Sequence, residues 1–265
     1  MNPTHSALPI LRLEGVSKRF GGLQALDGVS LQVPVGSIHG LIGPNGAGKT
    51  SLFNTITGLY AADSGRFELQ GKPYSPSEPH QVAQLGIART FQNIRLFNAM
   101  TVLENVMIGR HVRTRAGALA AILRTSGQRR EEAQIEQRAR ECLAFVGLEH
   151  RARQAAANLS YGDQRRLEIA RALATDPVLL ALDEPAAGMN PTEKAGLRDL
   201  LSSIRARGTT LLLIEHDVKL VMGLCDGVTV LDHGKVIADG TPASVQKHPA
   251  VIEAYLGTHA DKVST

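Results

Sequence analysis

One stretch of the chain combines glycines with a lysine and a threonine: Gly43-Pro44-Asn45-Gly46-Ala47-Gly48-Lys49-Thr50. It matches G-x-x-x-x-G-K-[ST], the phosphate-binding loop or P-loop. The glycines let the backbone approach an anion closely, so N–H groups at a helix N-terminus can point at phosphate oxygens. In such a loop Lys49 holds the β- and γ-phosphates of a nucleotide and the Thr50 hydroxyl binds Mg²⁺. The pattern therefore predicts a nucleotide site.

The residues on either side of this loop suit the motif. A short apolar run, Ile38–Ile42, precedes the loop, and a helix-compatible segment, 51–57, follows it. A strand before the loop and a helix after it are the context that a P-loop requires. The alternative is a glycine-rich turn with an ordinary surface lysine, and the motifs that follow argue against it.

Two acids end a later apolar run. Residues 178–182 form an uninterrupted apolar strand pattern, followed by Asp183 and Glu184. Carboxylates at the C-terminal edge of a parallel sheet face the ligand crevice. Asp183 is placed to act on Mg²⁺ through water, and Glu184 to orient or deprotonate an attacking water. Acids are common in turns, so this pair gains its meaning from the P-loop that precedes it.

A serine and a glycine open a predicted helix about 20 residues before Asp183. The segment reads Leu159-Ser160-Tyr161-Gly162-Asp163-Gln164. Ser160 and Asp163 suit an ordinary N-cap pairing, so a simple helix start is one interpretation. The position of the segment, ahead of the acidic strand, favours a functional one.

Length and composition fit one large domain of a globular protein. The chain has 265 residues, of which 43% are hydrophobic and 20% charged, which is ordinary for such proteins. No apolar run reaches the roughly 18 residues of a membrane helix, and residues 1–9 do not resemble a secretory signal. A membrane role would thus require a partner. Cys142 and Cys225 form no metal or disulfide pattern, and we expect buried free thiols.

The net charge of +4 is concentrated in residues 110–140, where eight arginines face three glutamates. The arginines are Arg110, Arg113, Arg115, Arg124, Arg129, Arg130, Arg138 and Arg140. The stretch has no aromatic residue for base stacking, so we expect no nucleic-acid partner. We interpret it as a solvated helical face, with contact to anionic lipid head groups beside a membrane partner as the alternative.

Periodicity predicts alternating strands and helices. We expect half-buried strands at 11–13, 29–33 and 67–69, buried strands at 178–182 and 211–214, and a hairpin of 228–231 with 236–238. We expect helices at 81–86, 101–109, 128–146, 163–174 and 192–207. Apolar strands bounded by helices indicate a buried, mostly parallel sheet. The helical stretch between its two halves is interpreted as an insert.

In this order and spacing, the P-loop, the Ser160 helix start and Leu182-Asp183-Glu184-Pro185 resemble the ATP-binding cassette (ABC) ATPase family. The resemblance covers about residues 11–257. It implies an α/β fold with a P-loop (RecA-like), mostly parallel sheet core, an antiparallel β subdomain and a helical subdomain. We expect a single ABC ATPase domain at 9–257, with the helical subdomain at about 75–160.

The resemblance also assigns the segment 159–164. In the family this signature motif contacts the γ-phosphate of the ATP held by the opposite subunit of a head-to-tail dimer. Ser160 and Gly162 match the family pattern, whereas Tyr161 and Asp163 replace the usual Gly and Gln. A second ABC ATPase subunit, either another copy or a sister cassette, is therefore an implied partner.

Four further residues receive roles from the resemblance. Gln92 would reach Mg²⁺ and the attacking water, and His216 would contact the γ-phosphate. Asn190 would hydrogen-bond across the dimer, and Phe20 would stack on adenine. The implied catalytic residues are Glu184, His216 and Gln92, and the metal set is Thr50, Gln92 and Asp183. The implied ATP-binding set is Phe20, the loop from Gly43 to Thr50, Ser51, Ser160, Gly162 and Asn190.

Several stretches look like the ATP-binding subunits of branched-chain amino acid importers. Examples are Arg89-Thr90-Phe91-Gln92, Leu159-Ser160-Tyr161-Gly162 and Ala254-Tyr255-Leu256-Gly257. This resemblance implies integral membrane permease partners, an extracytoplasmic binding protein that acts indirectly, and a peripheral location on the cytoplasmic face of the inner (cell) membrane. Alternatives are a cassette for urea or amide import or lipopolysaccharide export, a soluble non-transport ABC ATPase, and a nucleic-acid ATPase.

Overall fold

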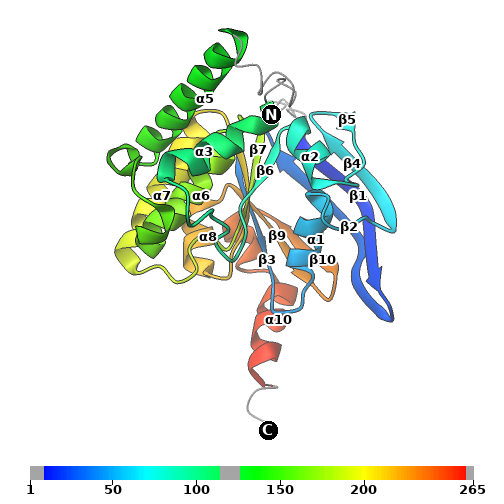
Figure 1. Cartoon of the computed structure of the whole chain (residues 1–265). Coiled ribbons are helices and arrows are strands. Elements are labelled where there is room, and N and C mark those ends of the chain that lie inside the picture. The colour runs from blue at the N-terminus through cyan, green and yellow to red at the C-terminus, as the bar shows by residue number, and fades with distance from the viewer. Residues whose placement is uncertain (1–8, 114–125, 261–265) are drawn as a thin grey trace, which may run out of the picture.

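The computed structural model of the chain describes residues 9–113 and 126–260, and Figure 1 shows their arrangement. The strands are β1 (Pro9–Phe20), β2 (Leu23–Pro34), β3 (Ile38–Ile42), β4 (Ser64–Leu69), β5 (Lys72–Pro73), β6 (Ile87–Arg89), β7 (Leu179–Asp183), β8 (Thr210–Ile214), β9 (Gly227–Asp232) and β10 (Lys235–Gly240). The α-helices are α1 (Lys49–Ile56), α2 (Pro79–Leu85), α3 (Val102–Arg110), α5 (Ser126–Phe145), α6 (Tyr161–Leu173), α7 (Pro191–Ala206), α8 (Val218–Leu224), α9 (Pro242–Val245) and α10 (Pro249–Ala260).

The larger sheet positions the predicted site. Its strand order is β10-β9-β3-β8-β7-β6, and all neighbouring strands run parallel except β10, which is antiparallel to β9. Every residue of β3, β7 and β8 is buried, which the continuous apolar runs at 178–182 and 211–214 predicted for β7 and β8. The strand before the P-loop, β3, lies between β8 and β9, which come from much later in the chain. The predicted α/β fold with a mostly parallel sheet is confirmed.

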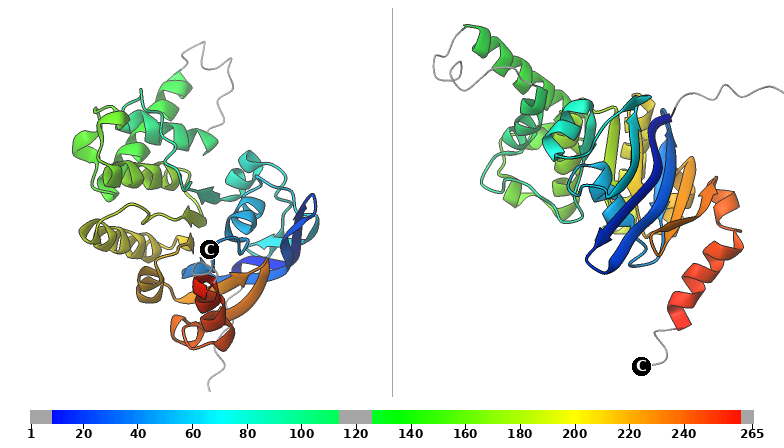
Figure 2. Two further views of the ribbon diagram at one scale, coloured as in Figure 1. Left: turned by 90° about the horizontal axis from the view of Figure 1, so that it is seen from below. Right: turned by 90° about the vertical axis from the view of Figure 1, so that its right-hand side faces the viewer.

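The larger sheet separates two apolar cores. Ile38 and Ile42 of β3 belong to a core that includes residues of α3, α5, α6 and α7. Leu41 of the same strand belongs to a core formed with α1, β1, β2 and β4. The division follows from the alternation of side chains along a strand. Figure 2 shows the helices of the first core and the strands of the second on opposite sides of the molecule.

The smaller sheet is antiparallel, with strand order β2-β1-β4-β5. The strands predicted at 11–13, 29–33 and 67–69 lie inside β1, β2 and β4, which are longer. β1 spans 12 residues, and its pairing with β2 contains register shifts. Bulges of this kind interrupt the two-residue alternation, so the sequence pattern revealed only part of each strand.

The predicted helices at 101–109, 128–146, 163–174 and 192–207 agree with α3, α5, α6 and α7 to within about two residues. The sequence pattern missed β6, α8 and α10. β6 has three residues, too few to display a period. α10 is apolar over much of its circumference and shows no single stripe. In the described part of the chain, no helix has the length and apolar character needed to cross a membrane.

Part of the basic stretch 110–140 can be located. Residues 114–125 lie outside the described residues. Arg110 and Arg138 both donate hydrogen bonds to Asp176, and Arg138 Nη2 lies 2.6 Å from its carboxylate. Arg140 pairs with Glu136 one turn earlier on α5, at 2.7 Å. These three guanidinium groups thus have acid partners within the chain.

The two cysteines are free and buried, at 3% exposure for Cys142 and 8% for Cys225. Burial raises the pKa of both thiols, that of Cys225 to about 12. Because the thiolate is the reactive form, both should react with 5,5′-dithiobis(2-nitrobenzoate) at pH 8 at least about 100-fold more slowly in the native protein than in denaturant. Rapid release of two equivalents of thionitrobenzoate from native protein would contradict this expectation.

Candidate active site

The P-loop joins β3 to α1, and two of its glycines are required by close backbone contacts. A Cβ on Gly43 would lie 2.0 Å from the Leu231 carbonyl oxygen, and one on Gly48 would lie 2.6 Å from that of Ala25. Gly48 also has a φ of 100°, a region that side chains disfavour. α1 begins at the next residue, Lys49. The loop is therefore packed tightly against the ends of other strands, with its helix N-terminus directed at the site.

The Lys49 ammonium group contacts the start of the loop that carries it. Its Nζ donates hydrogen bonds to the carbonyl oxygens of Gly43 and Pro44, at 2.7 and 2.9 Å. Burial lowers the pKa of Lys49, and the nearby carboxylates of Glu184 and Asp183 oppose that shift. A partly buried cation beside two acids can bind phosphate oxygens.

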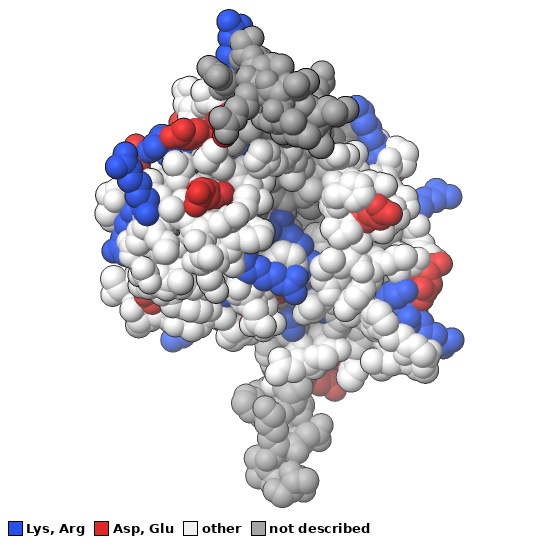
Figure 3. Space-filling model, viewed as in Figure 1, with Lys and Arg blue, Asp and Glu red and all other residues white. Residues whose placement is uncertain are grey.

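A cavity of about 480 Å³ opens in front of the P-loop. The predicted residues among its lining are Phe20, Asn45, Gly46, Ala47, Gly48, Lys49, Thr50, Ser51, Gln92 and Glu184. The structure thus brings an aromatic ring from β1, the loop and a carboxylate from the end of β7 to one cavity. In Figure 3, Lys and Arg side chains lie in the central hollow of the face shown.

The three predicted catalytic side chains meet at one carboxylate oxygen. Gln92 Nε2 donates a hydrogen bond to Glu184 Oε2 at 3.0 Å, and His216 Nδ1 lies 3.5 Å from the same oxygen. Glu184 has a φ of 46°, a conformation that costs free energy in residues other than glycine. The turn after β7 thus holds its carboxylate in the cavity at an energetic cost.

Asp183 ends β7 and is buried. Burial raises the pKa of its carboxyl group, and the guanidinium of Arg89 opposes the shift. Arg89 Nη2 lies 3.5 Å from Asp183 Oδ2, and its Nη1 donates to the side chains of Asn54 and Thr57. Arg89 thus connects this acid to α1. The sequence did not identify that role, although Arg89 lies three residues before Gln92.

The predicted Mg²⁺ ligands are compatible with that ion. Thr50, Gln92 and Asp183 offer a hydroxyl, an amide and a carboxylate oxygen, the donor type that Mg²⁺ prefers. No group of three or more His, Cys, Asp or Glu side chains in the described residues could hold a metal. Mg²⁺ in nucleotide sites is usually bound by one or two carboxylates plus substrate phosphates.

Ser160, Gly162 and Asn190 lie outside the P-loop cavity and form a second group. Ser160 is the N-cap of α6 and its Oγ accepts a hydrogen bond from the Asp163 N–H at 3.2 Å. Asn190 is the N-cap of α7, in a capping box with Glu193. Two helix N-termini with hydroxyl or amide side chains can bind an anion, but not within this chain's own cavity.

These two helix N-termini are close to one another. A Cβ on Gly162 would lie 3.0 Å from Glu193 Oε1, so Gly162 contacts the first turn of α7. The carboxylate of Asp163, which departs from the family pattern, lies 3.3 Å from Arg151 Nη1. Because its charge is paired within the chain, it presents less negative potential to an anion at the helix start.

Sequence reasoning also missed Glu215, which lies between strand β8 and His216. It is buried and accepts hydrogen bonds from the N–H groups of Ala186 and His216, at 2.8 and 3.3 Å. Burial raises the pKa of its carboxyl group, and the Ala186 hydrogen bond opposes that shift. Glu215 thus joins the segment after Glu184 to the segment that carries His216. The sequence did contain a signal for Glu215, since an acid stands directly before His216 at the end of a predicted buried strand.

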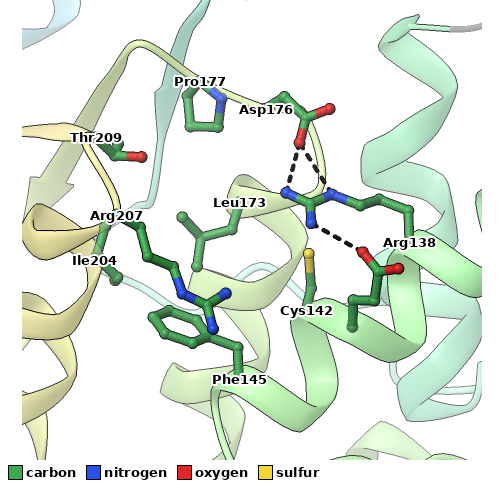
Figure 4. A pocket seen from close by; sticks show the side chains of 10 residues that line it. Arg138, Cys142, Phe145, Leu173, Asp176, Pro177, Ile204, Arg207 and Thr209 are labelled. Carbon is green, nitrogen blue, oxygen red and sulfur yellow. Dashed lines mark hydrogen bonds and ion pairs between the residues drawn. The ribbon is translucent and has the colours of Figure 1, made fainter.

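A separate cavity of about 460 Å³ lies between α5, the end of α6 and the end of α7. Figure 4 shows two arginines that line this cavity. Arg207 lies over the ring of Phe145, and Arg138 is hydrogen-bonded to Asp176. None of the predicted site residues lines this cavity. It is therefore distinct from the candidate active site.

The comparisons with known proteins agree with the motifs. Residues 26–187 match the family model described as ABC transporter, and residues 235–261 match that of the branched-chain amino acid ATP-binding cassette transporter. The high-affinity branched-chain amino acid transport ATP-binding protein LivG of Salmonella typhimurium is 46% identical over 250 residues, which span 94% of this chain and 98% of LivG.

Solved structures show the same fold. The ADP conformation of MJ1267, an ATP-binding cassette of an ABC transporter, has a TM-score of 0.82 and 36% identity, covering 95% of this chain and 100% of MJ1267. The dimeric structure of the post-hydrolysis state of the ATP-binding cassette MJ0796, bound to ADP and Pi, has a TM-score of 0.73 and 25% identity, covering 88% of this chain and 98% of MJ0796.

Proposed function

Because this chain belongs to the ATP-binding cassette (ABC) transporter family, we propose that it energises the uptake of branched-chain amino acids through membrane permeases. It is an ATP-binding subunit that hydrolyses ATP, as its family does. The observation that carries the proposed site is the meeting of Gln92, Glu184 and His216 beside the P-loop. The single domain expected at 9–257, with its helical subdomain at about 75–160, remains part of this proposal.

Several groups in the proposed site bind the phosphates of ATP and neutralise their charge. The Lys49 ammonium and the backbone N–H groups of the loop from Gly43 to Thr50 bind the β- and γ-phosphates. Mg²⁺, when held by Thr50, Gln92 and Asp183, neutralises phosphate charge. Phe20 supplies a flat apolar surface for adenine. These contacts also orient the γ-phosphate towards the end of β7.

Hydrolysis is assigned to the carboxylate after β7. Glu184 accepts a proton from water, the water oxygen forms a bond to the γ-phosphorus, and the bond to the β–γ bridging oxygen breaks to leave ADP. Gln92 orients the water beside Glu184. His216 binds the γ-phosphate, and its contact with Glu184 holds the imidazole ring near the reacting groups.

The second group of residues would serve a partner cassette. Ser160 and Gly162 at the start of α6, with Asn190 at the start of α7, would contact the nucleotide held by the opposite subunit. The partner is another copy or a sister cassette, and the dimeric MJ0796 cassette supports such an arrangement. ATP would favour the closed dimer because it binds that state more tightly.

An apolar groove supports the proposed permease partner. A cavity of about 370 Å³ lies beside the Gln92 loop, lined by α2, α3 and α6 and by Leu59, Phe91 and Phe97. Leu59 and Phe97 are 42% and 48% exposed, and Leu85 and Met100 are exposed as well. Apolar exposure of this kind is typical of an interaction site. A permease segment seated there would contact the loop of Gln92 directly.

The cargo assignment rests on relatives rather than on a pocket in this chain. The match at residues 235–261 and the likeness to LivG support branched-chain amino acids as the cargo. An extracytoplasmic binding protein would deliver them to the permeases. The chain would then lie on the cytoplasmic face of the inner membrane, bound to the permeases. The alternatives are urea or amide import, lipopolysaccharide export, and a soluble non-transport ATPase.

Uptake of labelled leucine at low external concentration tests this function. Cells that lack this chain should lose uptake, and wild type but not the Glu184→Gln variant should restore it. Labelled urea and an unrelated amino acid serve as controls for the cargo. If uptake of leucine is unchanged in the deleted strain and that of urea is lost, the cargo proposal is wrong while the ATPase assignment stands.

A further inference from the structure

A fully buried ion pair lies beneath the loop that carries Gln92. The Arg165 side chain is 0% exposed and that of Glu168 is 1% exposed, and Nη1 of Arg165 lies 3.0 Å from Oε2 of Glu168. Both residues are on α6, one turn apart. Arginine and glutamate are rarely buried completely unless they are paired, so this position in the fold needs an explanation.

The ion pair binds the backbone of two consecutive loop residues. Arg165 Nη1 donates to the Phe91 carbonyl oxygen and Nη2 to the Gln92 carbonyl oxygen, both at 2.6 Å. Oε1 of Glu168 accepts a hydrogen bond from the Phe91 N–H at 3.3 Å. Three charge-assisted hydrogen bonds therefore hold the backbone of this loop to α6.

Stability alone explains this arrangement poorly. Buried ion pairs often stabilise a fold no better than apolar side chains of similar volume, because both charges lose their hydration. Burial raises the pKa of Glu168, and Arg165 opposes that shift. Within the described residues, Nε of Arg165 is buried without a hydrogen-bond partner, an additional cost. We therefore attribute the burial of this pair to its effect on the loop, whose backbone it holds in place.

The loop leads directly to the reacting groups. Arg165 holds the carbonyl oxygen of Gln92, and the side chain of the same residue donates a hydrogen bond from Nε2 to Glu184. The guanidinium carbons of Arg89 and Arg95 lie 4.5 and 4.1 Å from the centroid of the neighbouring Phe91 ring. α6 begins just after Ser160, about 7 Å along the helix axis from Arg165.

We propose that Arg165 and Glu168 are positioning residues that fix Gln92 against Glu184 and tie this placement to α6. The inference rests on the proposed role of Gln92 in hydrolysis. Since α6 is a continuous helix, a displacement of its Ser160 end moves Arg165 and with it the Gln92 backbone. When Ser160 of one cassette contacts the nucleotide held by the opposite cassette, the movement of α6 would therefore change the position of Gln92 in the first cassette's own hydrolysis site.

The test is a mutant cycle on the purified chain. Arg165→Gln with Glu168→Gln removes both charges while keeping side-chain length, and Gln92→Ala removes the group that the pair is proposed to position. Arg140→Gln with Glu136→Gln on α5 provides a matched control pair, because these side chains also form an ion pair but are 41% and 46% exposed. For each variant, kcat, KM for ATP, the affinity for ATP and the thermal midpoint are measured.

We expect the Arg165–Glu168 double variant to lower kcat about tenfold or more, because small misplacements of reacting groups have large effects on rate. ATP affinity should change by less than about twofold, since the P-loop is untouched. In the Gln92→Ala background the same double variant should lower kcat by less than about twofold. The control pair should leave kcat unchanged.

If the Arg165–Glu168 double variant lowers kcat by the same factor in the wild-type and Gln92→Ala backgrounds, the inference is overturned. Equal factors would show that the pair acts independently of Gln92. Unchanged kcat in the double variant would overturn it as well. If that variant does not fold, Arg165→Lys replaces it, since a compact ammonium lacks the planar fork with which Arg165 meets the two carbonyl oxygens and the carboxylate from two nitrogens. Wild-type hydrolysis that is insensitive to Gln92→Ala would reject the proposed role of Gln92 separately.

Discussion

Glu184→Gln is expected to bind ATP with an affinity close to that of the wild type and to lower turnover by about 10²- to 10⁴-fold. The substitution keeps the shape of the side chain and its hydrogen bond from Gln92 but removes the group that accepts the proton from water. Because ATP then persists, the variant should accumulate as a dimer. Turnover measured by phosphate release, ATP titration and size-exclusion chromatography with ATP test the three parts.

Glu132→Gln is a suitable control for this variant, because Glu132 is exposed on α5, outside the residues that line the P-loop cavity. It should hydrolyse ATP at the wild-type rate. Hydrolysis at that rate by Glu184→Gln would show that another group accepts the proton, and Glu184 would lose its catalytic assignment.

Lys49→Ala is expected to weaken ATP binding by about 10- to 100-fold and to abolish measurable hydrolysis. A hydrogen bond to a charged group contributes about 1.5–3 kcal/mol, and each 1.4 kcal/mol is a factor of ten in affinity. Lys49 is the cation that the P-loop directs at the β- and γ-phosphates. Titration with a fluorescent ATP analogue measures the affinity.

The fold should survive this substitution, because Lys49 lines the open cavity, so water can enter in its place and hydrogen-bond the two carbonyl oxygens. Lys72→Ala, an exposed position on β5, is the control and should bind ATP normally. Wild-type affinity in Lys49→Ala would mean that the nucleotide is held elsewhere.

The P-loop and the acids after β7 could be predicted from sequence because each is a local pattern beside a buried strand. Their chemistry depends on a few adjacent residues, and a parallel sheet brings the C-terminal ends of its strands together. Ser160, Gln92 and His216 needed the family resemblance, since a lone polar residue at a helix or strand end carries no chemistry of its own.

The supports of the site could not be predicted in this way. Arg165 binds the Phe91 carbonyl across 74 residues of sequence, and Arg89 meets Asp183 across 94. Periodicity describes neighbours along one element and says nothing about such pairs. Arg165 lies on the predicted helix among other charged residues, so the pattern gave no sign of its complete burial. The short strand β6 escaped detection for a related reason, because it is defined by its pairing with β7.

The place of β3 between β8 and β9 has a consequence for biosynthesis. Ile38 at the start of β3 donates its N–H to Asp226, which is 188 residues later in the sequence. At a synthesis rate of about 5–20 residues per second, the ribosome needs roughly 10 to 40 seconds to deliver that partner. For most of this interval both edges of the nascent β3 lack their final neighbours, and unpaired apolar strand edges promote aggregation. The strand on which nucleotide binding depends thus leaves the ribosome well before either of its two neighbours in the sheet.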